Sequence, residues 1–175
     1  MKESRMREAN TIPGYLEVAR AGDMVYVKGH GQCLASMCVS LCDFSGEMIE
    51  EGFNRFVFDL EDVTSLDSTF MGTLIGLHAL ADEHIDETEE CAITVVNVTS
   101  HCMKQMRLVG LNNLLCFLPG KIEFPSFETT VLEDREVSES ERIKLIKEAH
   151  ERLVEVDSRN EDMFGALLSA LRREA

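Results

Sequence analysis

The sequence predicts an α/β fold, with a mixed β-sheet of about four to five strands covered by helices and a C-terminal helical extension. Two observations predict the sheet and its helices: an opening pair of alternating strands, and the later alternation of short apolar runs with segments of helical period. The third is that strand signals stop after about residue 132. At 175 residues and 45% hydrophobic content, the chain can bury one core.

The chain opens with a predicted hairpin. Residues 15–20 alternate between apolar and polar side chains, an Ala-Gly-Asp turn follows, and residues 24–29 form the second strand. Residues 30–52 change to helical spacing, and Gly52 ends that helix. The next run, "RFVFDL" at 55–60, is typical of a strand buried on both faces.

The later segments continue the alternation of helices and strands. They are a helix with apolar positions between 70 and 80, an acidic loop at 82–90, a strand at 92–98, a helix capped by Ser100 and ended by Gly110, and a strand at 114–118. Pro119 and Gly120 end the last strand. Residues 12–120 are therefore predicted to form one α/β domain.

Residues 133–175 are predicted to form a separate helical extension. Ser138 and Glu141 have the spacing of a capping box, and apolar residues follow at helical intervals. The polar break "DSRNED" at 157–162 indicates one kinked helix or two consecutive helices. An apolar stripe at this spacing suits either packing on the chain's own domain or contact with a second copy or a partner, so both interpretations stay open.

Composition excludes several classes of function. The formal charge is −15, from 32 acidic and 17 basic residues, and such a surface repels nucleic acid and anionic lipid. The chain has no Trp for stacking on bases. No apolar run approaches a membrane span, and residues 1–10 lack the apolar stretch of a secretory signal. We therefore expect a cytoplasmic protein that neither binds nucleic acid nor inserts into membranes.

The sequence gives little support for catalysis, metals or cofactors. Its six cysteines are scattered through apolar segments without a CxxC pair, which is typical of buried thiols in a reducing compartment. His101 and Cys102 are adjacent on a helix and do not face each other, and His30 with Cys33 lacks a third partner. We expect no enzyme, no metal and no cofactor. A small thiol hydrolase or redox protein that uses Cys33 or Cys102 is the competing hypothesis.

Asp67, Ser68 and Thr69 place three polar side chains at the start of the helix after "RFVFDL". One explanation is capping, in which Asp67 or Ser68 accepts a hydrogen bond from the first turn. The other is a modification site, because a helix N-terminus has unpaired amides and a partial positive charge that stabilise a phosphate.

The stretch "FVFDLEDVTSLDSTFMGTLIGL", followed by an acidic loop and "AITVVNV", resembles the STAS domain of anti-sigma factor antagonists. In that family a buried strand ends in Asp-Leu, and Asp-Ser-Ser/Thr-Gly opens a helix a few residues later. Asp59 and Leu60 match the strand end, and Asp67, Ser68 and Thr69 match the helix start. The resemblance covers roughly residues 12–120.

The resemblance implies partner switching. The unphosphorylated protein binds an anti-sigma factor that is also a serine kinase, phosphorylation breaks the complex, and a phosphatase restores it. Ser68 matches the phosphoacceptor, with Thr69 as a rival, and transcription is the implied output. The residues expected at the partner surface are Asp59, Asp62, Asp67, Ser68, Thr69, Phe70 and Met71.

One position departs from the family pattern, because Phe70 stands where the family has glycine. Phe70 either points into the core and leaves the site intact, or projects outward and changes which partner fits. The alternative function is a constitutive scaffold or assembly subunit of a signalling complex without phosphorylation. In either case the C-terminal helices are candidates for a homodimer contact.

Overall fold

The computed structural model describes residues 13–86, 88 and 91–174. Three parts of the sequence analysis lie outside these residues. They are residues 1–10, residue 12 at the start of the predicted domain, and part of the acidic loop at 82–90. The elements are β1 (Tyr15–Ala21), β2 (Met24–Cys33), η1 (Ala35–Met37), α1 (Cys38–Glu50), β3 (Arg55–Leu66), α2 (Ser68–Asp82), β4 (Ile93–Val96), α3 (Ser100–Leu108), η2 (Leu111–Asn113), β5 (Cys116–Phe117), β6 (Thr130–Leu132), α4 (Glu139–Val156) and α5 (Asn160–Glu174).

The strands form one mixed sheet in the order β5-β4-β3-β2-β1-β6. β1 pairs antiparallel with both β2 and β6, whereas β2, β3, β4 and β5 run parallel. The predicted α/β class, the mixed sheet and the C-terminal helices are confirmed. The sheet has six strands among the described residues rather than four to five, because β6 at Thr130–Leu132 was not predicted.

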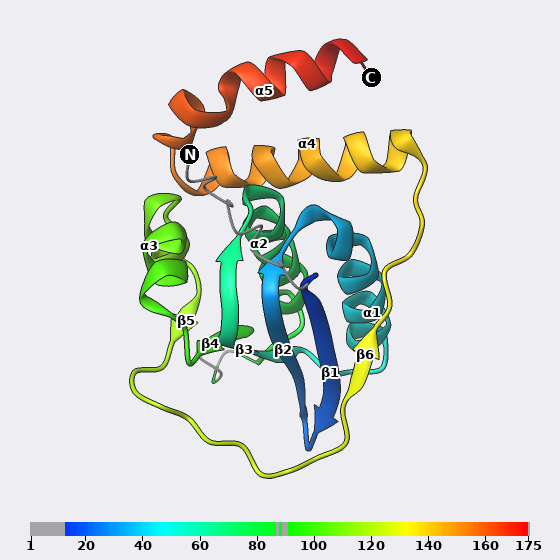
Figure 1. Ribbon diagram of the computed structural model, residues 1–175, viewed down its shortest axis with the longest axis vertical. Coiled ribbons are helices and arrows are strands. Elements are labelled where there is room, and N and C mark those ends of the chain that lie inside the picture. Colours follow the sequence, from blue (N-terminus) through cyan, green and yellow to red (C-terminus); the bar gives the residue numbers. More distant parts are fainter. Residues whose placement is uncertain (1–12, 87, 89–90, 175) are drawn as a thin grey trace, which may run out of the picture.

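Helices α1 and α2 cover one face of the sheet, and their apolar side chains join it in the main core (Figure 1). α2 carries one charged residue, Asp82, and is apolar almost all round. Such a helix is buried on more than one side. In this chain the second side is covered by α4, which crosses between α5 and the rest of the molecule in Figure 1 and packs on α2.

Both central strands are longer than predicted. β2 continues through His30 to Cys33, where we expected a helix, and its pairing with β3 shifts register on both sides of His30 and Gly31. Gly31 has φ +65°, a conformation that suits glycine. A Cβ on Gly29 would lie 2.6 Å from Cγ2 of Val63, so the tight packing of the two strands here depends on glycine. Helical spacing begins only at η1 and α1.

Smaller corrections concern helix ends. Thr99, not Ser100, caps α3, because its Oγ1 accepts a hydrogen bond from the amide of Cys102 at 3.3 Å. The capping box of α4 is present as predicted between Ser138 and Glu141. The C-terminal segment forms two helices, α4 and α5. The division into domains at 12–120 and 133–175 stays a prediction, and β6 lies between the two parts.

The second face of the sheet is covered in part by the segment that connects β5 to β6. Its apolar side chains, at Ile122, Phe124 and Phe127, pack with Tyr26, Val57 and Val96 in a small separate cluster. Helices therefore cover one face of the sheet, and the β5–β6 connection covers part of the other. The predicted site residues are divided between these two faces.

Candidate functional site

Asp67 joins two helix starts with one carboxylate. Its Oδ1 accepts the amide hydrogen of Phe70 at 2.7 Å and so caps α2. Its Oδ2 accepts the amide hydrogen of Ala35, at the start of η1, at 2.8 Å. Hydrogen bonds from amides to a carboxylate are among the stronger ones in proteins. Asp67 therefore has a structural role, and both carboxylate oxygens have a partner within the fold.

Ser68 is the first residue of α2, and its hydroxyl contacts the C-terminal helices. Oγ lies 2.8 Å from Nε2 of His150 in α4. Nδ1 of the same ring lies 2.7 Å from the carbonyl oxygen of Ile146. A carbonyl only accepts, so Nδ1 carries a proton, and in the neutral imidazole Nε2 accepts the hydroxyl hydrogen of Ser68. The ring of Phe164 in α5 packs edge-on against His150, with centroids 4.8 Å apart.

The three residues after Ser68 are buried. Thr69 and Met71 are 5% exposed, and Phe70 is fully enclosed in the main core. Of the two orientations considered for Phe70, the structure has the one that points inward. The fold therefore tolerates Phe at this position by burying it, and neither Phe70 nor Met71 offers a surface to a partner in this arrangement.

α4 approaches α2 closely along a row of small residues, Ser68, Gly72 and Gly76, which are four residues apart and share one helix face. A Cβ on Gly72 would lie 2.6 Å from the carbonyl carbon of Ala149 and closer still to its oxygen. A Cβ on Gly76 would lie 2.6 Å from Nη1 of Arg152. The backbone of α4 therefore rests on α2, and the C-terminal extension docks on its own chain.

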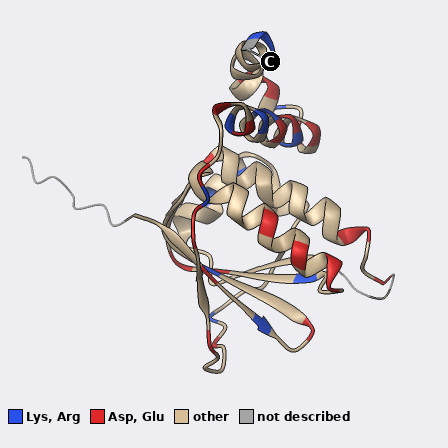
Figure 2. Ribbon diagram, turned by 90° about the vertical axis from the view of Figure 1, so that its right-hand side faces the viewer, with Lys and Arg blue, Asp and Glu red and all other residues tan. Residues whose placement is uncertain are grey.

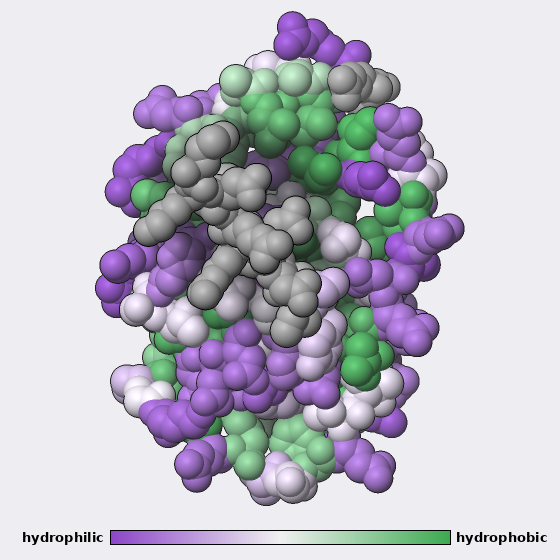
Figure 3. Space-filling model, viewed as in Figure 1, coloured by the Kyte–Doolittle hydropathy of each residue, from purple (hydrophilic) through white to green (hydrophobic). Residues whose placement is uncertain are grey.

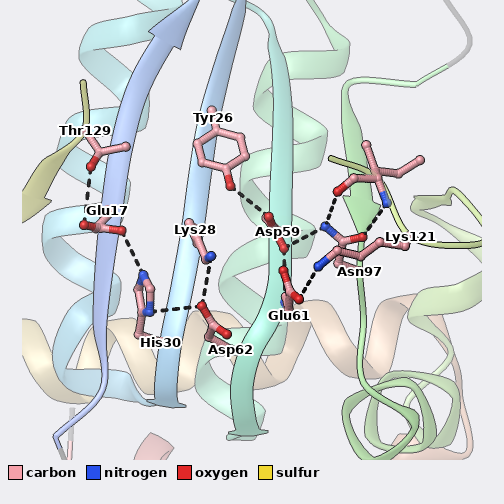
Figure 4. A network of polar contacts seen from close by, with 11 residues as sticks. Glu17, Tyr26, Lys28, His30, Asp59, Glu61, Asp62, Asn97, Lys121 and Thr129 are labelled. Carbon is pink, nitrogen blue, oxygen red and sulfur yellow. Dashed lines mark hydrogen bonds and ion pairs between the residues drawn. The ribbon is translucent and has the colours of Figure 1, made fainter. Parts of the chain in front are cut away.

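Asp59 lies on the other face of the sheet from α2. Its carboxylate is 3% exposed and accepts hydrogen bonds from the Tyr26 hydroxyl at 2.8 Å, the Glu61 amide at 3.1 Å and the Asn97 side chain at 3.2 Å (Figure 4). Burial, reinforced by Asp59, raises the pKa of Tyr26. Asn97 also bonds both backbone groups of Ile122. Asp59 thus fixes the β5–β6 connection to the sheet.

Asp62 lies on the same face as Asp59. It forms an ion pair with Lys28 at 2.9 Å and lies 3.5 Å from Nδ1 of His30, as Figure 4 shows. Hydrogen bonding to Lys28 holds the pKa of Asp62 below its usual range. Neither Asp59 nor Asp62 adjoins Ser68, although the resemblance led us to expect all three at one partner surface. The structure places only Asp67, Ser68 and Thr69 of the predicted polar set together.

The cysteines offer little thiol chemistry. Burial raises the pKa of Cys33 to about 12, and it also raises the pKa of Cys38 and Cys102. Cys42 is exposed rather than in the core, contrary to expectation. Within the described residues there is no group of three or more His, Cys, Asp or Glu side chains able to hold a metal ion. No helix in that same part of the chain has the length and apolar character to cross a membrane.

The outer surface of the extension is mixed in character. Charged residues line α4 and α5 at the top of Figure 2, and nine of the eighteen residues of α4 are charged. Hydrophobic residues gather over α5 in Figure 3, where Met163 is 43% and Leu167 is 38% exposed. A hollow of about 450 Å³ lies beside the start of α4, between Ala35, Val39 and Arg142.

Comparison with solved structures agrees with the fold. The NMR structure of the protein TM1081 aligns with 58% of this chain and 78% of its own, at 15% sequence identity and a TM-score of 0.51. The chain has a STAS-like fold. A crystal structure of TM1081 from Thermotoga maritima, described as a proposed anti-sigma factor antagonist, aligns at 16% identity over 58% of this chain and 84% of that one, with a TM-score of 0.46.

An anti-sigma factor antagonist from Mycobacterium paratuberculosis aligns at 19% identity over 62% of this chain and 87% of that one, with a TM-score of 0.49. No protein-family model and no curated protein matches the sequence. The fold is thus the level at which the likeness to known proteins holds.

Sequence reasoning missed His150, which lies 82 residues after Ser68. No local pattern joins the two positions. The spacing of Ser68, Gly72 and Gly76 was the available signal, because small residues four apart on an otherwise apolar helix permit another helix to approach closely. That signal would have favoured docking of the extension on α2.

Proposed function

We propose that this protein is a regulatory protein-binding module, an anti-sigma factor antagonist whose partner affinity is controlled by phosphorylation of Ser68. The observation that carries the proposal is the start of α2. There Asp67 has both oxygens engaged by backbone amides and Thr69 is buried, whereas Ser68 is half-buried and presents its hydroxyl at the helix N-terminus. Ser68 is thus the member of the trio that neither caps the helix nor lies in the core, and the contact of its hydroxyl is with His150 of α4.

The chemistry suits this position. Transfer of the terminal phosphoryl group of ATP to Oγ of Ser68 forms the phosphate ester and releases ADP and the hydroxyl proton. The product carries about −1.5 to −2 charges beside the first-turn amides, which stabilise an anion. A partner docked at the same helix end would meet that charge and lose affinity. Coupling of about 1–3 kcal/mol, typical of such switches, changes affinity about 5- to 150-fold.

The competing function is a constitutive scaffold. Exposed Met163 and Leu167 on α5 favour it, because they offer an apolar contact that requires no modification. The kinase-type anti-sigma factor and the phosphatase belong to the switching proposal alone. A homodimer through α5 is compatible with both functions.

The test is phosphopeptide mass spectrometry on the protein isolated from its own cells, during growth and under stress. We expect phosphate on Ser68 whose occupancy changes with the condition. Affinity capture then compares Ser68→Ala with Ser68→Glu, and Ser140→Ala on exposed α4 is the matched control. Ser68→Ala and the control should retain the same partner, and Ser68→Glu should lose it. Unmodified Ser68 in every condition, with equal capture by all variants, would leave the scaffold as the better account.

A further inference from the structure

The site proposed for phosphorylation is covered by the chain's own C-terminus. His150 and Ala149 of α4 lie directly on Ser68 and Gly72, and His150 is 2% exposed. A protein kinase must bring ATP within bonding distance of Oγ, in line with the serine hydroxyl. With α4 in this position, the imidazole of His150 occupies that side of the hydroxyl. In this arrangement, α4 therefore closes off Oγ of Ser68 from a kinase.

The cover consists of the last two helices. α5 packs on α4, where Leu168 and Leu171 are buried, and both helices stand apart from the sheet in Figures 1 and 2. Only three residues of α4 are fully buried, Ala149, His150 and Leu153. Polar contacts anchor the corner between the helices, where the Asn160 side chain donates to the carbonyls of Val109 and Leu153. α4 contacts α2 along the row of Ser68, Gly72 and Gly76, and Leu153 of α4 joins the main core.

We infer that α4 and α5 are an intramolecular cover over Ser68, and that release of this cover is the step that admits a kinase or a protein partner to α2. This inference rests on the proposed function for its biological meaning, but the cover itself is a physical claim about the chain. Release uncovers the Ser68, Gly72 and Gly76 row beside apolar Met71 and Ile75, a surface that accepts a helix with small residues, as α4 does now.

Phosphate and cover exclude each other. A phosphate group does not fit in the 2.8 Å between Oγ of Ser68 and the His150 ring. The contact of the Ala149 backbone on Gly72 leaves no room for α4 to move closer to α2, so space for a phosphate requires α4 to move outward. Phosphorylation therefore holds α4 off α2, while the added charge also opposes a partner at the same helix end. After dephosphorylation, α4 and a partner compete for the uncovered surface of α2.

The first experiment uses the full chain and a pair of glycine substitutions. Gly72→Ala places a methyl group against the backbone of Ala149, whereas Gly46→Ala in α1 meets nothing within 4 Å and is the matched control. Both favour the helix locally to a similar extent. Hydrogen exchange followed by peptide mass spectrometry should show exchange in α4 at least ten-fold faster in Gly72→Ala, with β2 and β3 unchanged. Gly46→Ala should match the wild type.

The second experiment measures cover directly. Ser68→Cys is combined with Gly72→Ala or with Gly46→Ala, and alkylation of residue 68 by iodoacetamide is followed by peptide mass spectrometry. We expect labelling at least ten-fold faster with Gly72→Ala. Three results would overturn the inference: unchanged exchange in α4, faster exchange in the strands together with α4, or equal labelling in the two chains. Neither measurement uses a kinase, so absence of phosphate in cells would count against the proposed function alone.

Discussion

Replacement of Asp67 tests how much of the site is structural. Asp67→Ala removes the cap on the Phe70 amide, which costs about 1 kcal/mol. It also leaves the Ala35 amide without its carboxylate, which costs about 1–3 kcal/mol when the amide cannot reach water. We therefore expect the free energy of unfolding to fall by about 2–4 kcal/mol. For a chain of this length the melting temperature should fall by about 5–15 °C.

Asp67→Ser separates the two contributions. A serine hydroxyl caps the Phe70 amide but cannot also reach Ala35, so Asp67→Ser should cost less than Asp67→Ala by about 1 kcal/mol. Urea unfolding followed by circular dichroism measures each free energy. Ser138→Ala, at the exposed capping box of α4, is the control and should cost about 0.5–1 kcal/mol. The reasoning is wrong if Asp67→Ala lies within about 0.5 kcal/mol of the wild type.

Three further predictions concern the core, a thiol and a surface charge. Phe70→Ala should lower the free energy of unfolding by about 3–5 kcal/mol, and Leu108→Ala, at a 65% exposed position, by less than about 0.5 kcal/mol in the same urea titration. Cys33 has a pKa of about 12, so only about one thiol in 10⁴ is ionised at pH 8. It should therefore stay unalkylated by iodoacetamide in the native chain at that pH. Fast labelling of Cys33 would support the thiol-enzyme hypothesis. The pKa of Asp62 is lowered in the folded state, so its ion pair with Lys28 stabilises the fold above the unfolded pKa of about 3.9. The free energy of unfolding should exceed that of Asp62→Asn by about 0.5 kcal/mol, and this difference should fade as the pH falls below about 4. A difference that does not depend on pH would contradict this.

Sequence patterns predicted the helices and strands that are determined by residues close together in the chain. The alternating hairpin, the apolar run of β3 and the capping box of α4 are all determined within a few residues, and each is present. β6 was missed because three exposed or half-exposed residues form a strand only by pairing with β1, more than 100 residues earlier. Its own sequence carries no distinguishing pattern.

The candidate site was predicted in part for the same reason. Asp67, Ser68 and Thr69 are consecutive, so their position at one helix start follows from the helix itself. Asp59 was grouped with them because it matches the Asp at the strand end of the family pattern, although alternation along β3 turns its side chain to the opposite face from Phe58 and Leu60. Contact between α4 and α2 depends on tertiary packing, and an apolar stripe alone does not say which surface it meets.

The pairing of β6 with β1 has a consequence for competition at α2. It fixes the chain to the sheet as far as Leu132, so the tether that carries α4 is residues 133–138, which span at most about 20 Å. Arg135 shortens it further, because its amide donates to Ser40 and its guanidinium pairs with Asp43. A segment on so short a tether has an effective concentration of about 1 mM or more at its docking surface. An outside protein at about 1 µM must therefore bind that surface about 10³-fold more tightly than α4 does, a difference of about 4 kcal/mol, to occupy it half of the time.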